Sequence, residues 1–205
     1  RVGGEGADLP TDVSQVTYHN NSDAYEDFEP GAHFLQLSKT ERNMLDLVCD
    51  NFDKVVVVYN GANAMELGFV NEYEAIKGVL WCPGTGQSGF DGLGRILSGQ
   101  VNPSGRTSDT FVYDLAATPT ANNFGNFVYD NADGFQYTET GFTGKETTTT
   151  PTFVNYAEGI YVGYRFYETA AAEHLIDYED TVLYPFGYGL SYTAFEQEMG
   201  PLTEA

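Results

Sequence analysis

The chain has 205 residues, of which 41% are hydrophobic and 15% aromatic, enough to bury the core of one ordinary domain. Nine Lys and Arg residues against thirty Asp and Glu residues give a formal net charge of -21. A surface of that sign repels phosphate backbones and anionic lipids. We therefore expect neither nucleic acid nor a membrane as a partner.

Residues 1–36 are rich in Gly, Asp, Asn and aromatic side chains and show no sustained period, which predicts a long irregular loop region. Loops of this length in a compact domain are usually functional or disordered. Within this region, Gly3-Gly4-Glu5-Gly6-Ala7-Asp8 is a candidate functional segment, because it combines two carboxylates with a Gly-rich backbone that bends freely.

A helix is predicted to begin after Ser38, because Ser38 and Glu41 form a capping-box pattern. Apolar residues at helical spacing continue the helix to about Asp50 and give it one apolar face. Two apolar runs, 54–59 and 78–82, predict strands buried on both faces, and helical stretches are expected near 64–73 and 90–97. This alternation predicts an α/β fold with a mostly parallel sheet flanked by helices and with long loops.

The second half of the chain has weaker patterns. Residues 117–153 are predicted to form an irregular, Thr-rich excursion, and the alternating aromatics of 159–167 predict a strand. Cys49 and Cys82 lie in apolar runs without metal-ligand spacing and are expected to be buried free thiols. His19, His33 and His174 are scattered without zinc-ligand spacing, so no metal site is expected.

Several strings occur in one order along the chain and together carry a resemblance to a known family. They include Gly4-Glu5-Gly6-Ala7-Asp8, the strand 55–60 with Glu66-Leu67, and Trp81-Cys82-Pro83-Gly84. The most specific are NPSGR at 102–106, EGIYVGYR at 158–165 and FGYGLSYT at 186–193. In these residues the chain resembles the C-terminal α/β-sandwich domain of glycoside hydrolase family 3, of the β-glucosidase type.

The resemblance implies a retaining β-glycosidase built from a (β/α) barrel and an α/β sandwich, with the active site at their junction. Residues 1–205 would form the single sandwich domain, and the barrel of the same enzyme would supply the nucleophile, an Asp in a segment similar to Ser-Asp-Trp. No such segment occurs in this chain. The implied function is hydrolysis of terminal β-D-glucosidic or related bonds, with a β-glucoside or oligosaccharide as substrate and no cofactor.

The acid/base residue needs a separate argument. Many members of the family carry a Glu in a Pro-Gly-x-Glu-Gly context after the second strand, and here that position is Gly86. Glu5 is the candidate replacement, since its Gly-rich setting allows the backbone to approach a sugar closely. The ordinary alternative is that Glu5 lies in a solvated turn or forms a salt bridge.

Three further residues are candidates for substrate binding: Asp8, Asn60 and Glu66. Asn60 and Glu66 follow the end of a predicted strand, where ligands tend to bind in open α/β sheets. All three have a structural alternative in turns and packing. For the chain as a whole, the alternative function is a non-catalytic carbohydrate-binding or structural scaffold domain, which the missing nucleophile and Gly86 favour.

Overall fold

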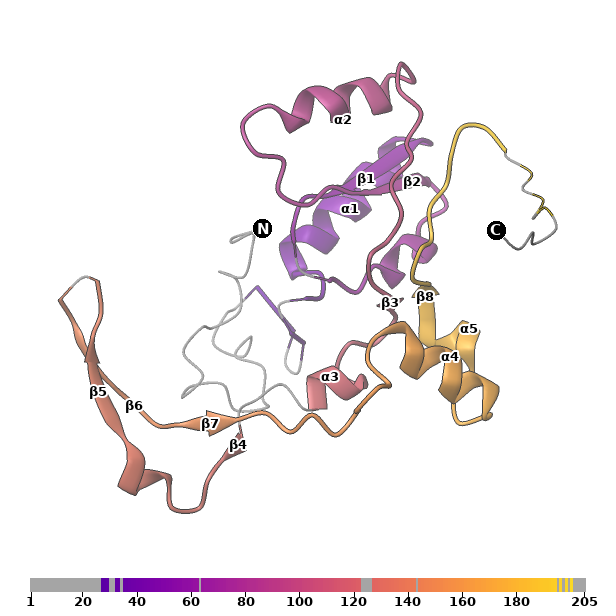
Figure 1. Ribbon diagram of the computed structural model, residues 1–205. Coiled ribbons are helices and arrows are strands. Elements are labelled where there is room, and N and C mark those ends of the chain that lie inside the picture. Colours follow the sequence, from indigo (N-terminus) through magenta and orange to yellow (C-terminus); the bar gives the residue numbers. More distant parts are fainter. Residues whose placement is uncertain are drawn as a thin grey trace.

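The computed structural model describes residues 27–29, 32–33, 35–62, 64–122, 127–142, 144–194, 196, 198 and 200 (Figure 1). A helix and a pair of strands lie together on one side, a long two-stranded arm extends away from them, and two short helices lie near the C-terminal strand (Figure 1). In the part of the chain so described, no helix is long and apolar enough to cross a membrane.

Helix α1 spans Lys39–Asn51 and begins as the sequence predicts. The Ser38 Oγ accepts from the Glu41 amide at 3.3 Å, and the Glu41 carboxylate accepts from the Ser38 amide at 2.9 Å. The capping box is therefore confirmed. The expected apolar face is only partly buried, because Leu45 is in the core while Met44 and Phe52 are exposed.

Strands β1 (Val55–Tyr59) and β2 (Ile76–Trp81) form a parallel pair, as the two apolar runs predict. The prediction that both faces are buried is wrong, because the residues of both strands are half-buried or exposed and Val56 is among the exposed ones. The connection between them contains a short 3₁₀ helix, η2 (Gly68–Glu72), where a helical stretch was expected. Helix α2 (Gly89–Leu97) follows β2. This half of the chain thus has the predicted order of helix, strand, helix, strand and helix.

The other described strands pair antiparallel. They are β3 (Phe111–Val112) with β8 (Val182–Tyr184), β4 (Phe127–Val128) with β7 (Thr152–Phe153), and β5 (Tyr137–Thr140) with β6 (Glu146–Thr149). The mostly parallel sheet flanked by helices is therefore not confirmed: the described residues form two-stranded sheets, and β1 with β2 is the parallel one.

The strand predicted over 159–167 is wrong, because helix α4 occupies Tyr164–Ala172. Gly163 precedes the helix with a φ of 60°, a left-handed conformation that glycine adopts without strain. Tyr167 and Ala170 are then buried at a spacing of three, which is a helical spacing. The alternation of aromatic and small residues that suggested a strand is thus a property of the turn 159–163 and the first helical turn. The short helices α3 (Pro119–Asn122) and α5 (Tyr178–Thr181) and the 3₁₀ helix η3 (Ala132–Phe135) complete the described helices.

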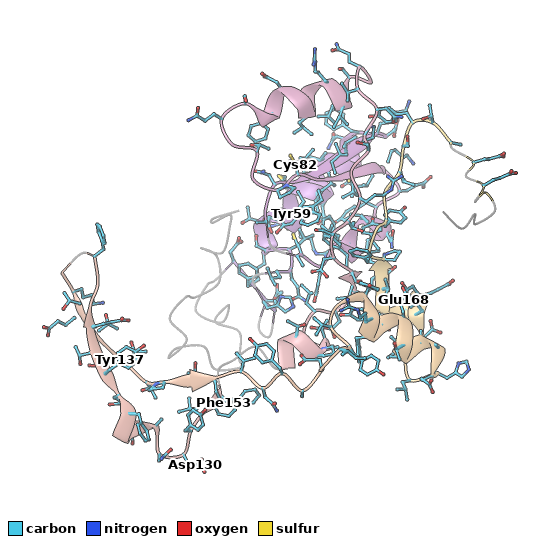
Figure 2. All side chains as sticks on the ribbon, in the orientation of Figure 1. Tyr59, Cys82, Asp130, Tyr137, Phe153 and Glu168 are labelled. Atoms are coloured by element: carbon cyan, nitrogen blue, oxygen red, sulfur yellow. The ribbon has the colours of Figure 1, made fainter. Side chains whose placement is uncertain are left out.

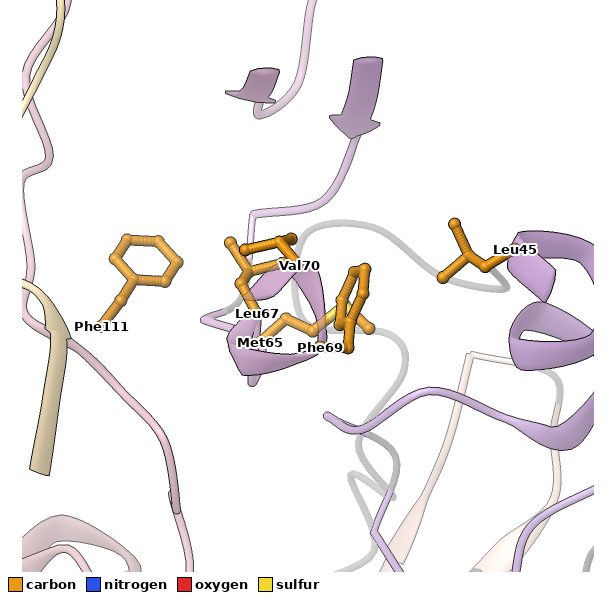
Figure 3. Packing of buried hydrophobic residues seen from close by; sticks show 6 residues of the cluster. All are labelled: Leu45, Met65, Leu67, Phe69, Val70 and Phe111. Atoms are coloured by element: carbon orange, nitrogen blue, oxygen red, sulfur yellow. The ribbon is translucent and has the colours of Figure 1, made fainter. Parts of the chain in front are cut away.

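In the described part of the chain, the core consists of two clusters that meet at β3. Phe111 joins the first cluster and Val112 the second, because successive side chains of a strand point to opposite sides. Trp81 is half-buried, packs against the first cluster and meets Phe111 edge to face, with ring centroids 5.2 Å apart. Figure 3 shows the buried residues of the first cluster: Leu45, Met65, Leu67, Phe69, Val70 and Phe111.

Two of the motif strings lie side by side although they are far apart in sequence. The Asn102 side-chain oxygen accepts from the Ser191 hydroxyl at 3.0 Å and from the Tyr192 amide at 2.8 Å. The Thr107 hydroxyl donates to the Pro185 carbonyl at 2.7 Å. The NPSGR and FGYGLSYT segments therefore form one structural unit that closes the domain.

The predicted excursion at 117–153 contains regular structure. Residues 127–153 form an arm in which the β5–β6 hairpin continues from the β4–β7 pair (Figure 1). Phe127 of β4 and Phe153 of β7 stack with ring centroids 5.4 Å apart. Tyr137 lies farther along the arm and is exposed (Figure 2), and Phe142 is exposed as well. The threonines at 147–149 thus lie in the mostly exposed strand β6, because the β-branched threonine side chain suits the pleated surface of a strand.

Both cysteines are free thiols, as expected, and are half-buried.

Candidate functional site

A cavity of about 440 Å³ opens beside the first turn of α1. Its wall combines the segment before α1, the polar side of α1, the start of η2 and one tyrosine after β3. The lining residues with polar or aromatic side chains are Glu29, Gln36, Ser38, Lys39, Arg42, Asn43, Glu66, Phe69, Glu72 and Tyr113.

The charges on this wall are paired with one another. The Arg42 guanidinium lies 2.7 Å from the Glu72 carboxylate, and the Lys39 ammonium lies 3.6 Å from the Glu29 carboxylate. The pairing with Glu72 raises the pKa of Arg42, so this residue stays charged. A wall of paired charges, amides and two aromatic rings suits a neutral polyhydroxylated ligand better than a phosphate, which needs an excess of positive charge.

Glu66 is the most constrained carboxylate of the cavity. Its Oε1 accepts from the His33 ring Nε2 at 3.0 Å and from the Leu115 backbone amide at 2.7 Å. Its Oε2 accepts from the Gln36 side-chain amide at 2.6 Å. Only 10% of its side chain is exposed. Three donors from two parts of the chain therefore meet at one nearly buried carboxylate.

The ionised form of Glu66 is the favoured one. Burial by itself would raise the pKa of Glu66, but the hydrogen bonds from His33, Leu115 and Gln36 hold that pKa below its usual value. Hydrogen bonds to a carboxylate favour the charged form more than burial disfavours it when several donors converge.

Asn60 lies elsewhere, at the end of β1, and is not among the residues that line the cavity. Its side-chain amide donates to the Cys82 carbonyl at 2.7 Å, and the Cys82 amide donates to the Tyr59 carbonyl at 2.8 Å. Figure 2 shows Tyr59 and Cys82 close together at the ends of β1 and β2. The structure therefore separates Asn60 from Glu66 and gives Asn60 a bond that joins the two strand ends.

The remaining predicted site residues, Glu5 and Asp8, lie outside the described residues. Gly86, at the position where many family members carry a Glu, has a φ of +59°, and a Cβ added there would meet no atom within 4 Å. The turn around Gly86 has space for a side chain but no carboxylate. Within the described ranges, no group of three or more His, Cys, Asp or Glu side chains could hold a metal ion.

The sequence pattern did not predict the partners of Glu66. Its partners His33, Gln36 and Leu115 lie 33, 30 and 49 positions from Glu66 in the sequence, and no local period reports a contact at such separations. Only the packing of the segment before α1 against the loop after β1 reveals it.

Comparison with known proteins places these features in a family. The model of the "Glycosyl hydrolase family 3 C-terminal domain" matches residues 10–164. A β-glucosidase of Ruminococcus albus is 35% identical over 160 residues, which are 78% of this chain and 14% of that protein. An exo-α-(1→6)-L-arabinopyranosidase of Bifidobacterium longum is 32% identical over 146 residues, which are 71% of this chain and 15% of that protein.

A solved structure agrees with the sequence comparisons. The crystal structure of a β-glucosidase from Paenibacillus barengoltzii matches with a TM-score of 0.56 and 31% identity, over 82% of this chain and 15% of that chain. The chain thus spans only 14% to 15% of the length of these proteins.

Proposed function

This chain belongs to glycosyl hydrolase family 3, and we propose that it supplies the sandwich domain and part of the sugar site of an enzyme that hydrolyses terminal β-glucosidic bonds. The observation that carries the proposal is the 35% identity to a β-glucosidase over 78% of the chain. The intact enzyme would also contain a (β/α) barrel, which binds the other side of the sugar.

The proposed mechanism is retaining. Such a mechanism needs two carboxyl groups about 5–5.5 Å apart, one as nucleophile and one as acid/base. In our proposal the nucleophile is an Asp of the barrel, outside these 205 residues, and Glu5 is the acid/base. The 205-residue chain alone should therefore not hydrolyse an aryl β-glucoside, because the first covalent step has no nucleophile.

Asp8, Asn60 and Glu66 are proposed to contribute to substrate binding. The polar wall around Glu66 supports a contact with sugar hydroxyls, since among the described residues Glu66 Oε2 accepts one hydrogen bond, from the Gln36 side chain, and a carboxylate oxygen can accept two. For Asn60, the support is its position at a strand end. Both glucosides and arabinopyranosides should be assayed as substrates, because the relatives include an enzyme named for an arabinopyranoside as well as β-glucosidases.

The decisive experiment replaces Glu5 by Gln in the intact enzyme. Loss of an acid catalyst should lower the rate for alkyl glycosides by about 10²–10⁴-fold and affect activated aryl glycosides less. Azide should restore the second step for activated substrates and yield a glycosyl azide, because azide needs no general base. Glu139→Gln, on the exposed hairpin, is the matched control and should behave like the wild type.

A uniform loss of rate without azide rescue would remove Glu5 from the acid/base role. The alternative function, a non-catalytic carbohydrate-binding or scaffold domain, is favoured by the absence of a carboxylate in the turn around Gly86. It predicts that the intact protein binds glucosides but turns none of them over.

A further inference from the structure

We propose that Glu66 is a positioning residue that holds the entry segment, whose described residues are 32–33 and 35–37, against the turn that follows β3. The entry segment is the part of the chain through which residues 1–26, with the candidate acid Glu5, connect to α1. The consequence for catalysis rests on the proposed function, whereas the positioning itself does not.

The three donors that bind the Glu66 carboxylate come from two separate parts of the chain. His33 and Gln36 belong to the entry segment, at 3.0 Å and 2.6 Å from the Glu66 carboxylate. The Leu115 amide, at 2.7 Å, belongs to the turn after β3. One side chain therefore joins two segments that are about 80 residues apart in the printed sequence.

Glu66 itself is held in place by its neighbours in the sequence and by a backbone hydrogen bond. Its neighbours Met65 and Leu67 are 4% and 2% exposed and belong to the first core cluster (Figure 3). The Glu66 amide also donates to the Leu35 carbonyl at 2.9 Å, which adds a backbone bond to the entry segment. A carboxylate between two core residues is a rigid support, because core side chains are closely packed.

The ring nitrogens of His33 are both engaged in hydrogen bonds within the chain. The His33 Nδ1 accepts from the Leu35 amide at 3.2 Å, so the proton of the neutral ring lies on Nε2 and is donated to Glu66. Both ring nitrogens are then occupied by internal bonds. The His33–Glu66 pair consequently has no nitrogen available to protonate a sugar oxygen, and its role is to hold the segment in place.

A test is possible because glutamine cannot replace this carboxylate. The three partners are all donors, and a Gln side chain has one accepting oxygen and one donating nitrogen, so at least one donor would face an N–H group. In the intact protein, Glu66→Gln should raise the hydrogen-exchange rate of the Leu115 amide by about tenfold or more, because that amide loses a charge-assisted bond. The Cys82 amide, which bonds Tyr59, should exchange as before.

The kinetic readout separates positioning from general loss of stability. If Glu66 orients the segment that carries Glu5, Glu66→Gln should lower kcat by about 10²-fold for alkyl glycosides and much less for activated aryl glycosides. A merely destabilised enzyme would lose both activities equally. Glu168→Gln is the matched control, because Glu168 on α4 accepts a hydrogen bond from the Tyr178 hydroxyl at 2.6 Å that a glutamine oxygen can also accept. It should change neither the exchange rate of the Leu115 amide nor the hydrolysis rates.

Gln36→Ala provides a second variant if Glu66→Gln does not fold, since it removes one donor and leaves the carboxylate in place. It should raise exchange of the entry-segment amides that it helps to hold. Unchanged exchange in both variants would overturn the positioning role, whether or not the protein is a glycosidase. Raised exchange with no dependence on the leaving group would overturn the link to Glu5. An intact wild type that hydrolyses no glycoside would instead count against the proposed function.

Discussion

At the scale of single residues, the closest approach between the two motif segments depends on Gly189. A Cβ at this position would lie 2.5 Å from the Gly105 carbonyl oxygen, and a backbone atom cannot move away cheaply. We expect Gly189→Ala to lower the free energy of unfolding by about 1–3 kcal/mol, the usual cost of overpacking. Urea unfolding followed by circular dichroism would measure it.

The control for Gly189 lies in the facing segment. A Cβ at Gly105 would meet no atom within 4 Å, so Gly105→Ala should change the stability by less than about 0.5 kcal/mol. Equal stability of the two variants would show that the segments do not pack as described.

Glu66 gives a second prediction at this scale, for the pH dependence of stability. Because its pKa in the folded chain lies below the usual value of 4.5, the unfolded state takes up a proton first as the pH falls. Glu66 therefore stabilises the fold fully at pH values well above 4.5, and this contribution is lost as the pH falls through the folded pKa.

The measurement is the difference in the free energy of unfolding between the wild type and Glu66→Gln. We expect a difference of roughly 1–3 kcal/mol near neutral pH, from hydrogen bonds to a charged group, that shrinks between about pH 5.5 and pH 3. Histidines of the unfolded chain are already protonated there. A difference that stays constant over this range would contradict the lowered pKa.

At the scale of elements, the start of α1 depends on one buried cap. Ser38 is 6% exposed and its hydroxyl accepts from the Glu41 amide. Ser38→Ala should lower the free energy of unfolding by about 0.5–2 kcal/mol, because a helix-end amide loses its acceptor. Thermal unfolding would measure the change.

Ser98 at the end of α2 is the matched control for Ser38. It is exposed, and its hydroxyl donates to the Arg95 carbonyl at 3.1 Å, so Ser98→Ala should cost less than about 0.5 kcal/mol. A larger loss at Ser98 than at Ser38 would mean that the capping box adds little to this helix.

At the scale of the whole molecule, the chain exposes large apolar side chains that a complete enzyme would be expected to cover. On α1 these include Met44 and Leu47, and on the arm they include Phe135, Tyr137 and Phe142. Two-stranded ribbons are marginally stable alone in water, and exposed apolar patches usually mark an interface. We therefore expect the isolated chain to self-associate.

Sedimentation velocity over a range of concentrations would detect this association. If the arm mediates the self-association, replacing Phe135, Tyr137 and Phe142 by Ser should shift the isolated chain toward the monomer. A wild-type chain that remains monomeric at high concentration would contradict the prediction.

The sequence by itself determined the features that depend on neighbouring residues or on whole strings. The capping box at Ser38 and Glu41 and the β-branched run of β1 are local patterns, and both are confirmed. The motif strings led to the family, which the match over 10–164 confirms. They did so because a string of specific residues carries more information than any single period.

Only the tertiary structure decided which distant groups meet. The Asn102 side chain bonds residues 89 to 91 positions away, and Glu66 finds partners 30 to 49 positions away. Nothing in a local period encodes such pairings. The strand expected at 159–167 failed for the same reason: alternation of aromatic residues is compatible with two backbones, and the burial of Tyr167 and Ala170 selects the helix. Hydrogen bonds and packing across the fold, rather than local preference, decide such cases.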